Sequence, residues 1–109
     1  MAIREEEIKN VTVGDQIVVI SEREAREKGH WYGRVAGWNG DDETGMNRWC
    51  GHTLTVRRIV SNNSGEIRLF VKENGFWWNA DFIQAVVPQE ELEAIELKDL
   101  EAILFGSVV

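Results

Sequence analysis

The alternation of apolar and polar positions predicts a chain built mainly from short β-strands. Residues 11–20 are rich in β-branched side chains, which favour strands. Residues 53–57 and 67–72 place apolar side chains at every second position, as strands with one buried face do. Residues 76–78 and 84–87 add two further short β segments after turn signals. We therefore expect a mainly β fold.

Turn signals separate these strands. Residues 61–65, Ser-Asn-Asn-Ser-Gly, have the composition of a hairpin loop. Asn74-Gly75 is the strongest two-residue turn signal in the chain, and residues 79–83 form a further turn. The alternation breaks at Arg58-Ile59, which predicts a bulge or the end of a strand. Short strands joined in this way indicate a small β-barrel or sandwich.

Two segments between the first two strands follow neither pattern. Residues 21–29 predict a short helix, because Ser21 can cap its first turn, Glu24 lies at the capping-box position and Gly29 can end it. Residues 30–51 hold five glycines and three tryptophans, so we expect a long loop there. Binding residues are often found on such loops, which makes this one a candidate site.

The segment after the last strand has a different composition. Residues 88–109 begin with Pro88, which suits the first position of a helix. Glu96 interrupts the apolar stripe that follows, which predicts two short helical pieces. We expect one β domain over residues 1–87 and an acidic, leucine-containing tail that packs on it or on another chain. The residues of this stripe, candidates for a homo-oligomer or partner contact, are Leu97, Leu100, Ile103 and Leu104.

The charge is unevenly distributed. The 109 residues include 19 acidic and 12 basic side chains, for a net charge of −7. Residues 90–101 alone contribute −5, with six acids and Lys98. An acidic chain is a poor match for the phosphate backbone, so direct nucleic-acid binding is not expected. Binding to a basic protein surface stays open.

The composition also restricts the class of protein. Cys50 is the single cysteine, so an intramolecular disulfide is excluded. The charged N-terminus lacks the apolar stretch of a signal peptide, and no run reaches the about 20 apolar residues that span a bilayer. We expect a cytoplasmic protein without a membrane contact.

Over residues 11–87 the chain resembles a family of small SH3-like barrel domains found in proteins of bacteriophages and bacterial mobile elements. The residues that carry the resemblance are Gly14-Asp15, Met46, Cys50-Gly51, Thr53-Leu54-Thr55-Val56, Trp77-Trp78 and Phe82-Ile83. The resemblance implies an SH3-like barrel, no established activity and, for a phage-encoded protein, the host cytoplasm. The Ala-Leu-Tyr-Asp-Tyr element and the Ser-Asn-Tyr pocket of SH3 domains proper are absent, so binding of proline-rich peptides is not expected.

The aromatic residues are the first candidate binding residues. Trp77 and Trp78 are neighbours on a strand, so they face opposite sides and cannot both enter one core. The loop aromatics could form a platform for a partner with the exposed member of this pair, or they could fill a thin core. The candidate residues are Trp31, Tyr32, Trp38, Trp49, Trp77 and Trp78. Arg57, Arg68 and Lys72 flank them, either as a contact for an acidic partner or as a charged outer sheet face.

Catalytic and metal sites are not expected. His30, Cys50 and His52 are the only soft metal ligands, and their spacing does not match a zinc knuckle. The run Asp41-Asp42-Glu43 does not match a calcium loop. No nucleophile–base pair or phosphate-binding glycine loop is recognisable. The sequence therefore predicts a protein without a cofactor that is not an enzyme.

These observations lead to three functional hypotheses. The first is a binding module, phage- or mobile-element-encoded, that engages a protein partner through the aromatic loop surface. The second is an inhibitor of a host nucleic-acid enzyme, such as an anti-CRISPR-like protein, whose carboxylates occupy a basic groove. The residues that would make this acidic contact are Asp41, Asp42, Glu43, Glu90, Glu91 and Glu93. The third is a small-molecule sponge with an aromatic pocket.

Overall fold

A five-stranded antiparallel sheet with a few short helices forms the fold, which confirms the mainly β prediction. The computed structural model describes residues 1–40 and 44–89. The elements in chain order are α1 (Glu5–Ile8), β1 (Gln16–Val19), α2 (Glu22–Glu27), the 3-10 helices η1 (His30–Tyr32) and η2 (Met46–Trp49), β2 (Thr53–Ser61), β3 (Ile67–Val71), β4 (Trp77–Trp78), the 3-10 helix η3 (Ala80–Phe82) and β5 (Ile83–Val87). The strand order is β4-β3-β2-β1-β5.

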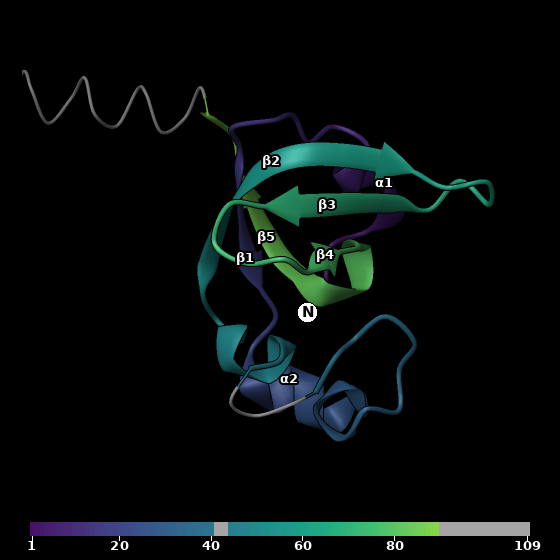
Figure 1. Cartoon of the computed structure of the whole chain (residues 1–109), viewed down its shortest axis with the longest axis vertical. Helices are drawn as coiled ribbons and strands as arrows, with labels where there is room; N and C mark the ends of the chain where they lie inside the picture. Colours follow the sequence, from purple (N-terminus) through teal and green to yellow (C-terminus); the bar gives the residue numbers. More distant parts are fainter. Residues whose placement is uncertain (41–43, 90–109) are drawn as a thin grey trace, which may run out of the picture.

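The long strand β2 joins the two halves of the sheet (Figure 1). Its first residues pair with β1, with Leu54 opposite Ile17, and its later residues pair with β3. The register shifts between Val56 and Arg58, so the bulge expected from the broken alternation is present. The bulge turns the side chains of Arg57 and Arg58 to the outside of the sheet, where both are exposed.

The connections between the later strands follow the expected turn positions. Asn62 organises the hairpin between β2 and β3, because its Oδ1 accepts hydrogen bonds from the backbone N–H of Ser64 and Glu66. The Asn74-Gly75 connection is longer than the two-residue turn predicted for it, since β3 ends at Val71 and β4 starts at Trp77. The Asn74 Oδ1 instead accepts from the backbone N–H of Phe76, which closes a local side-chain turn.

The predicted helix near residues 21–29 is present as α2. The hydroxyl of Ser21 accepts a hydrogen bond from the backbone N–H of Glu24 at 3.1 Å, as a helix cap does. The expectation of a loop without regular structure over residues 30–51 is wrong in part, because η1 and η2 form within it. The one-turn helix α1 has no counterpart among the predictions, and it is held by the burial of Ile8.

The core lies between the sheet and the segments that cover it. In Figure 1 the strands occupy the upper part, and α2 with the segment around η1 lies below them. The buried apolar residues are Ile3, Ile8, Val11, Ile17, Val19, Ile20, Ala25, Trp38, Met46, Leu54, Val56, Leu69, Val71, Trp78, Ala80, Phe82 and Ile83. The loop contributes Trp38 and Met46 to this set, so the core is shared between sheet and loop.

The C-terminal tail is described only as far as Gln89. The predicted helical pieces and the apolar stripe Leu97, Leu100, Ile103 and Leu104 lie outside the described residues. Within residues 1–40 and 44–89, no helix has the length and apolar character needed to cross a membrane.

Candidate interaction surface

The pair Trp77 and Trp78 divides between the two faces of the sheet, as their positions on one strand require. Trp78 is fully buried, whereas Trp77 is half-buried. Strand pairing explains this outcome, because Trp78 lies opposite the buried Leu69 and Trp77 lies opposite the half-buried Phe70. Trp77 stacks on the core residue Phe82, with ring centroids 6.1 Å apart, and is the member of the pair that keeps some exposure.

Trp38 belongs to the core and not to the surface. Its side chain is 5% exposed, and its ring meets Trp78 and Phe82 edge to face, with centroids 5.7 Å and 5.1 Å away. For Trp38 and Trp78 the geometry therefore matches the core-filling alternative. Neither ring is accessible to a partner in this fold.

Asn47 fixes the loop around Trp38. Its side chain is buried, and its Oδ1 accepts a hydrogen bond from the Trp38 indole Nε1 at 2.6 Å. Its Nδ2 donates to the backbone carbonyls of Trp31, at 3.1 Å, and Gly40, at 2.9 Å. One amide thus connects Asn47 on η2 to Trp31 and to the segment that holds Trp38 and Gly40. No pattern in the sequence singled out this residue, because its partners are set by the tertiary fold.

His30 is a buried titratable group in the same aromatic cluster. It is 4% exposed and packs 5.2 Å from Trp38 and 5.2 Å from Phe82, measured between ring centroids. Neither ring nitrogen has a hydrogen-bond partner among the residues that the structure describes. Burial lowers the pKa of His30 and the Lys28 ammonium adds to this effect, while Asp81 and Glu24 oppose it.

We expect the stability of the fold to fall as the pH drops below about 6.5, the ordinary pKa of histidine. Between that value and the lower pKa of the folded state, the unfolded chain binds more protons at this position, so protonation favours unfolding. Urea unfolding at pH 7.5 and 5.5 measures the effect. The His30→Phe variant fills the same space without titrating and should lose less stability over this interval than the wild type. Equal losses in the two proteins would show that His30 does not titrate on unfolding.

A second set of aromatic residues, Phe70 and Trp77, is half-buried on neighbouring positions of β3 and β4. Arg58 on β2 pairs with Phe70 on β3, and Phe70 pairs with Trp77 on β4, so these side chains form one row across three strands. The guanidinium carbon of Arg68 lies 4.1 Å from the centroid of the Trp77 ring. Those of Arg57 and Arg58 each lie 5.8 Å from the centroid of Phe70. We call these five residues, Arg57, Arg58, Arg68, Phe70 and Trp77, the basic aromatic face.

The arginines of this face differ in their polar contacts. Arg68 forms an ion pair with Glu66 at 2.8 Å, and the Nε of Arg57 donates to the backbone carbonyl of Val71 at 3.0 Å. Arg58 is exposed and has no ion pair with a described carboxylate. Lys72, predicted to flank the aromatics, follows the end of β3 and is exposed. The face therefore presents positive charge beside two half-buried rings.

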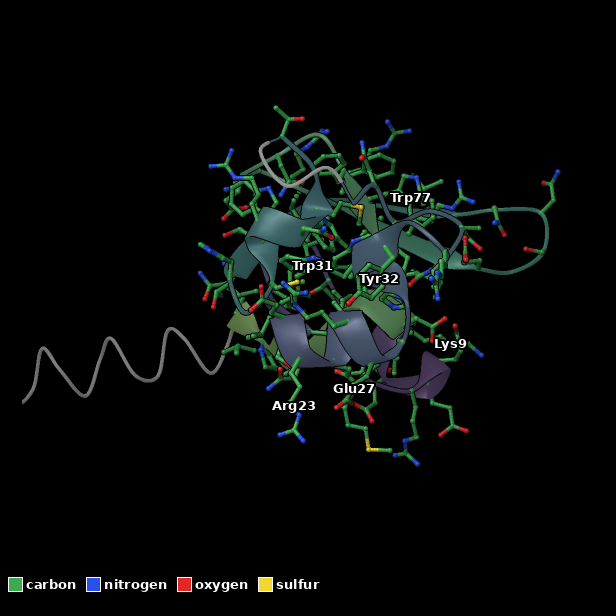
Figure 2. The ribbon with its side chains drawn as sticks, turned by 90° about the horizontal axis from the view of Figure 1, so that it is seen from below. Lys9, Arg23, Glu27, Trp31, Tyr32 and Trp77 are labelled. Carbon is green, nitrogen blue, oxygen red and sulfur yellow. The ribbon has the colours of Figure 1, made fainter. Side chains whose placement is uncertain are left out.

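The loop provides a smaller group of arginine–aromatic contacts near α2. Figure 2 shows Trp31 and Tyr32 beside this helix. The guanidinium of Arg26 lies 4.2 Å from the centroid of the half-buried Trp31. Tyr32 is 58% exposed, with Arg34 at 5.5 Å. The same loop continues to Gly37, whose Cα lies so close to the Trp77 ring that an added Cβ would overlap it. The loop thus reaches the edge of the basic aromatic face.

The contacts of the remaining loop candidates, Trp49 and Cys50, indicate a packing role and not a catalytic one. Trp49 is half-buried, with His52 and Arg48 at centroid distances of 5.5 Å and 5.2 Å. Burial raises the pKa of the Cys50 thiol to about 11, so the thiolate that would act as a nucleophile is scarce at neutral pH. No group of three or more potential metal ligands occurs within residues 1–40 and 44–89.

The acidic candidates cannot be placed. Asp41, Asp42, Glu43, Glu90, Glu91 and Glu93 all lie outside the described residues. The part of the chain that the structure describes contains eleven basic and ten acidic residues, a net charge of +1. The net negative charge of the whole chain therefore comes from residues 41–43 and 90–101, which lie outside the described residues.

A cavity of about 610 Å³ lies at another position, next to α1 and the end of β5. Its described lining residues are Glu7, Asn10, Thr12, Asp15, Val86, Pro88 and Gln89. None of these is aromatic, so the cavity does not match the aromatic pocket of the sponge hypothesis.

Sequence reasoning missed Arg58 as a site residue, although it identified Arg57, Arg68 and Lys72. The bulge between Val56 and Arg58 changes which side chains point outward, and the break in alternation at Arg58-Ile59 indicated it to within about one residue. With one extra residue inserted on β2, the strand pairing places Arg58 opposite Phe70. Comparison with protein-family models, with curated proteins and with solved structures finds no match for this chain.

Proposed function

We propose that the protein is a binding module of the SH3-like barrel type that engages a protein partner and catalyses no reaction. The five antiparallel strands and the long strand shared by both halves of the sheet support this fold type. So does the 3-10 helix η3, which leads directly into the last strand. The contact surface is the basic aromatic face, with Tyr32 on the adjoining loop as a further contact.

The stacking of arginines on half-buried aromatic rings carries this proposal. Arg68 on Trp77, at 4.1 Å, has a guanidinium whose position is restricted before a partner arrives. Such an arginine loses less conformational freedom on binding than a solvated lysine does. Its planar guanidinium can also donate two parallel hydrogen bonds to one carboxylate. Tryptophan and arginine are also the residues that dominate the binding energy of protein interfaces. A protein partner with exposed carboxylates is the chemistry that this face fits.

The exposed position of Arg58 allows a direct test. Immobilised wild-type protein is incubated with a bacterial host lysate and compared with Arg58→Glu and with Arg23→Glu as a matched control. Arg23 is also exposed and pairs only with Glu27 of its own helix, and Figure 2 shows it on the outer side of α2. We expect a partner that is retained by the wild type and the control and lost from Arg58→Glu. Retention should also weaken as salt is raised, because the contacts are charged. Identical captured sets for all three proteins would contradict the proposal.

A further inference from the structure

The acidic segment of the chain begins close to the basic aromatic face. Asp15 is buried, and its Oδ1 accepts a hydrogen bond from the backbone N–H of Gln89 at 2.8 Å. The backbone carbonyl of Asp15 accepts a second hydrogen bond, from the backbone N–H of Val56 at 2.9 Å. Val56 is the residue before Arg57, so Asp15 connects Gln89 to the strand residue that precedes the bulge.

The hydrogen bonds of Asp15 hold this arrangement in place. Its Oδ2 accepts from the backbone N–H of Thr12 at 2.8 Å, so both carboxylate oxygens bind backbone groups. Gly14, with φ of 99°, lies against the side chain of Gln89, and an added Cβ would overlap the side-chain amide. In Figure 1 the end of β5 lies at the same end of the sheet as the bend in β2.

The charges of the two regions are complementary. The basic aromatic face holds three arginines, of which Arg68 is paired with Glu66, while residues 90–101 carry −5. These twelve residues could span about 40 Å when extended. The three strands that carry the face cover only about 10 Å between the first and the third. A segment that starts at Gln89 is therefore long enough to reach every arginine of the face.

We propose that residues 90–101 bind the basic aromatic face of the same chain and compete there with the protein partner. This inference rests on the proposed function, because it assigns a regulator to the same surface. Attachment at Gln89 gives the segment a high effective concentration at the face, so even weak ion pairs suffice for occupancy. A partner must then displace the segment, and its apparent affinity is reduced by the fraction of the face that is covered.

The test uses the full-length protein with the arginine Nε–H and tryptophan indole resonances recorded by NMR. In the tail variant Glu90→Gln, Glu91→Gln and Glu93→Gln are combined. The control combines Glu5→Gln, Glu6→Gln and Glu27→Gln, which removes three exposed carboxylates elsewhere. We expect the resonances of Arg57, Arg58 and Trp77 to move in the tail variant and to stay in place in the control. Unmoved resonances in the tail variant would overturn the inference.

A free peptide of residues 88–105 supplies a second measurement. It should bind the tail variant about threefold or more tightly than the wild type, because the attached segment no longer competes. Equal affinities would overturn the inference. If the resonances shift with protein concentration, the acidic segment binds a second copy of the chain, and the inference of a contact within one chain is overturned. None of these outcomes affects the capture experiment with Arg58→Glu, so failure here is distinguishable from failure of the proposed function.

Discussion

Replacing Trp38 by alanine is expected to lower the free energy of unfolding by about 3–5 kcal/mol. The ring is 5% exposed and lies in contact with Trp78, Phe82 and His30. Its removal leaves a cavity between the loop and the sheet that the rigid strands cannot close. A domain of this size typically has about 5–15 kcal/mol of stability, so the substitution should remove a large fraction of it. Urea unfolding followed by near-ultraviolet circular dichroism measures the change.

The matched control for this substitution is Tyr32→Ala. Tyr32 lies on the same loop but is 58% exposed, so its removal should change the free energy of unfolding by less than about 0.5 kcal/mol. If Trp38→Ala unfolds at the same urea concentration as the wild type, Trp38 is not a core residue. The loop would then be free of the sheet, and its aromatics would return as surface candidates.

Asn47→Ala is expected to cost about 3 kcal/mol or more, the second large effect. The substitution leaves the buried indole N–H of Trp38 and the partly buried carbonyls of Trp31 and Gly40 without the hydrogen bonds that Asn47 makes to them. Each unpaired buried group costs about 1–3 kcal/mol. Thermal unfolding measures the loss, and hydrogen exchange of the Trp38 indole N–H should accelerate in conditions where the variant is still folded.

Two further variants test whether the hydrogen bonds of Asn47 cause this loss of stability. Asn47→Asp keeps an acceptor for Trp38 but turns a carboxylate oxygen toward the carbonyls of Trp31 and Gly40, so it should also be strongly destabilising. Asn63→Ala removes an exposed asparagine from the hairpin loop and should be nearly neutral. If Asn47→Ala proves as stable as Asn63→Ala, the hydrogen bonds of Asn47 do not hold the loop.

Local signals were sufficient for the sheet and for α2. The cap at Ser21, the hairpin at residues 61–65 and the bulge at Arg58 depend on neighbouring residues, and each is present in the structure. By contrast, η1 and η2 arise within a glycine-rich loop that is held by the distant contacts of Asn47. Helix α1 is a single turn without a distinctive local signal, and it depends on the burial of Ile8.

The candidate site was predictable only in part, for a related reason. Alternation along the strand indicates that Trp77 and Trp78 face opposite sides, but pairing with β3 decides which one is inside. For Trp38 the sequence left a surface platform and a core-filling role open, because its burial depends on its partners Asn47, Trp78 and Phe82. The net charge of −7 did not indicate the charge of the described residues, which is +1, because the acidic residues are concentrated at 41–43 and 90–101.

The central claim is that the basic aromatic face binds a protein partner independently of the core. The most direct measurement is the dissociation constant of the captured partner for wild type, Arg58→Glu and Arg23→Glu, determined by titration calorimetry together with thermal unfolding. We predict that Arg58→Glu binds about tenfold or more weakly, a loss of about 1.4 kcal/mol, while Arg23→Glu binds as the wild type does. All three proteins should unfold within about 2 °C of one another. Equal affinities for Arg58→Glu and the wild type would contradict the account.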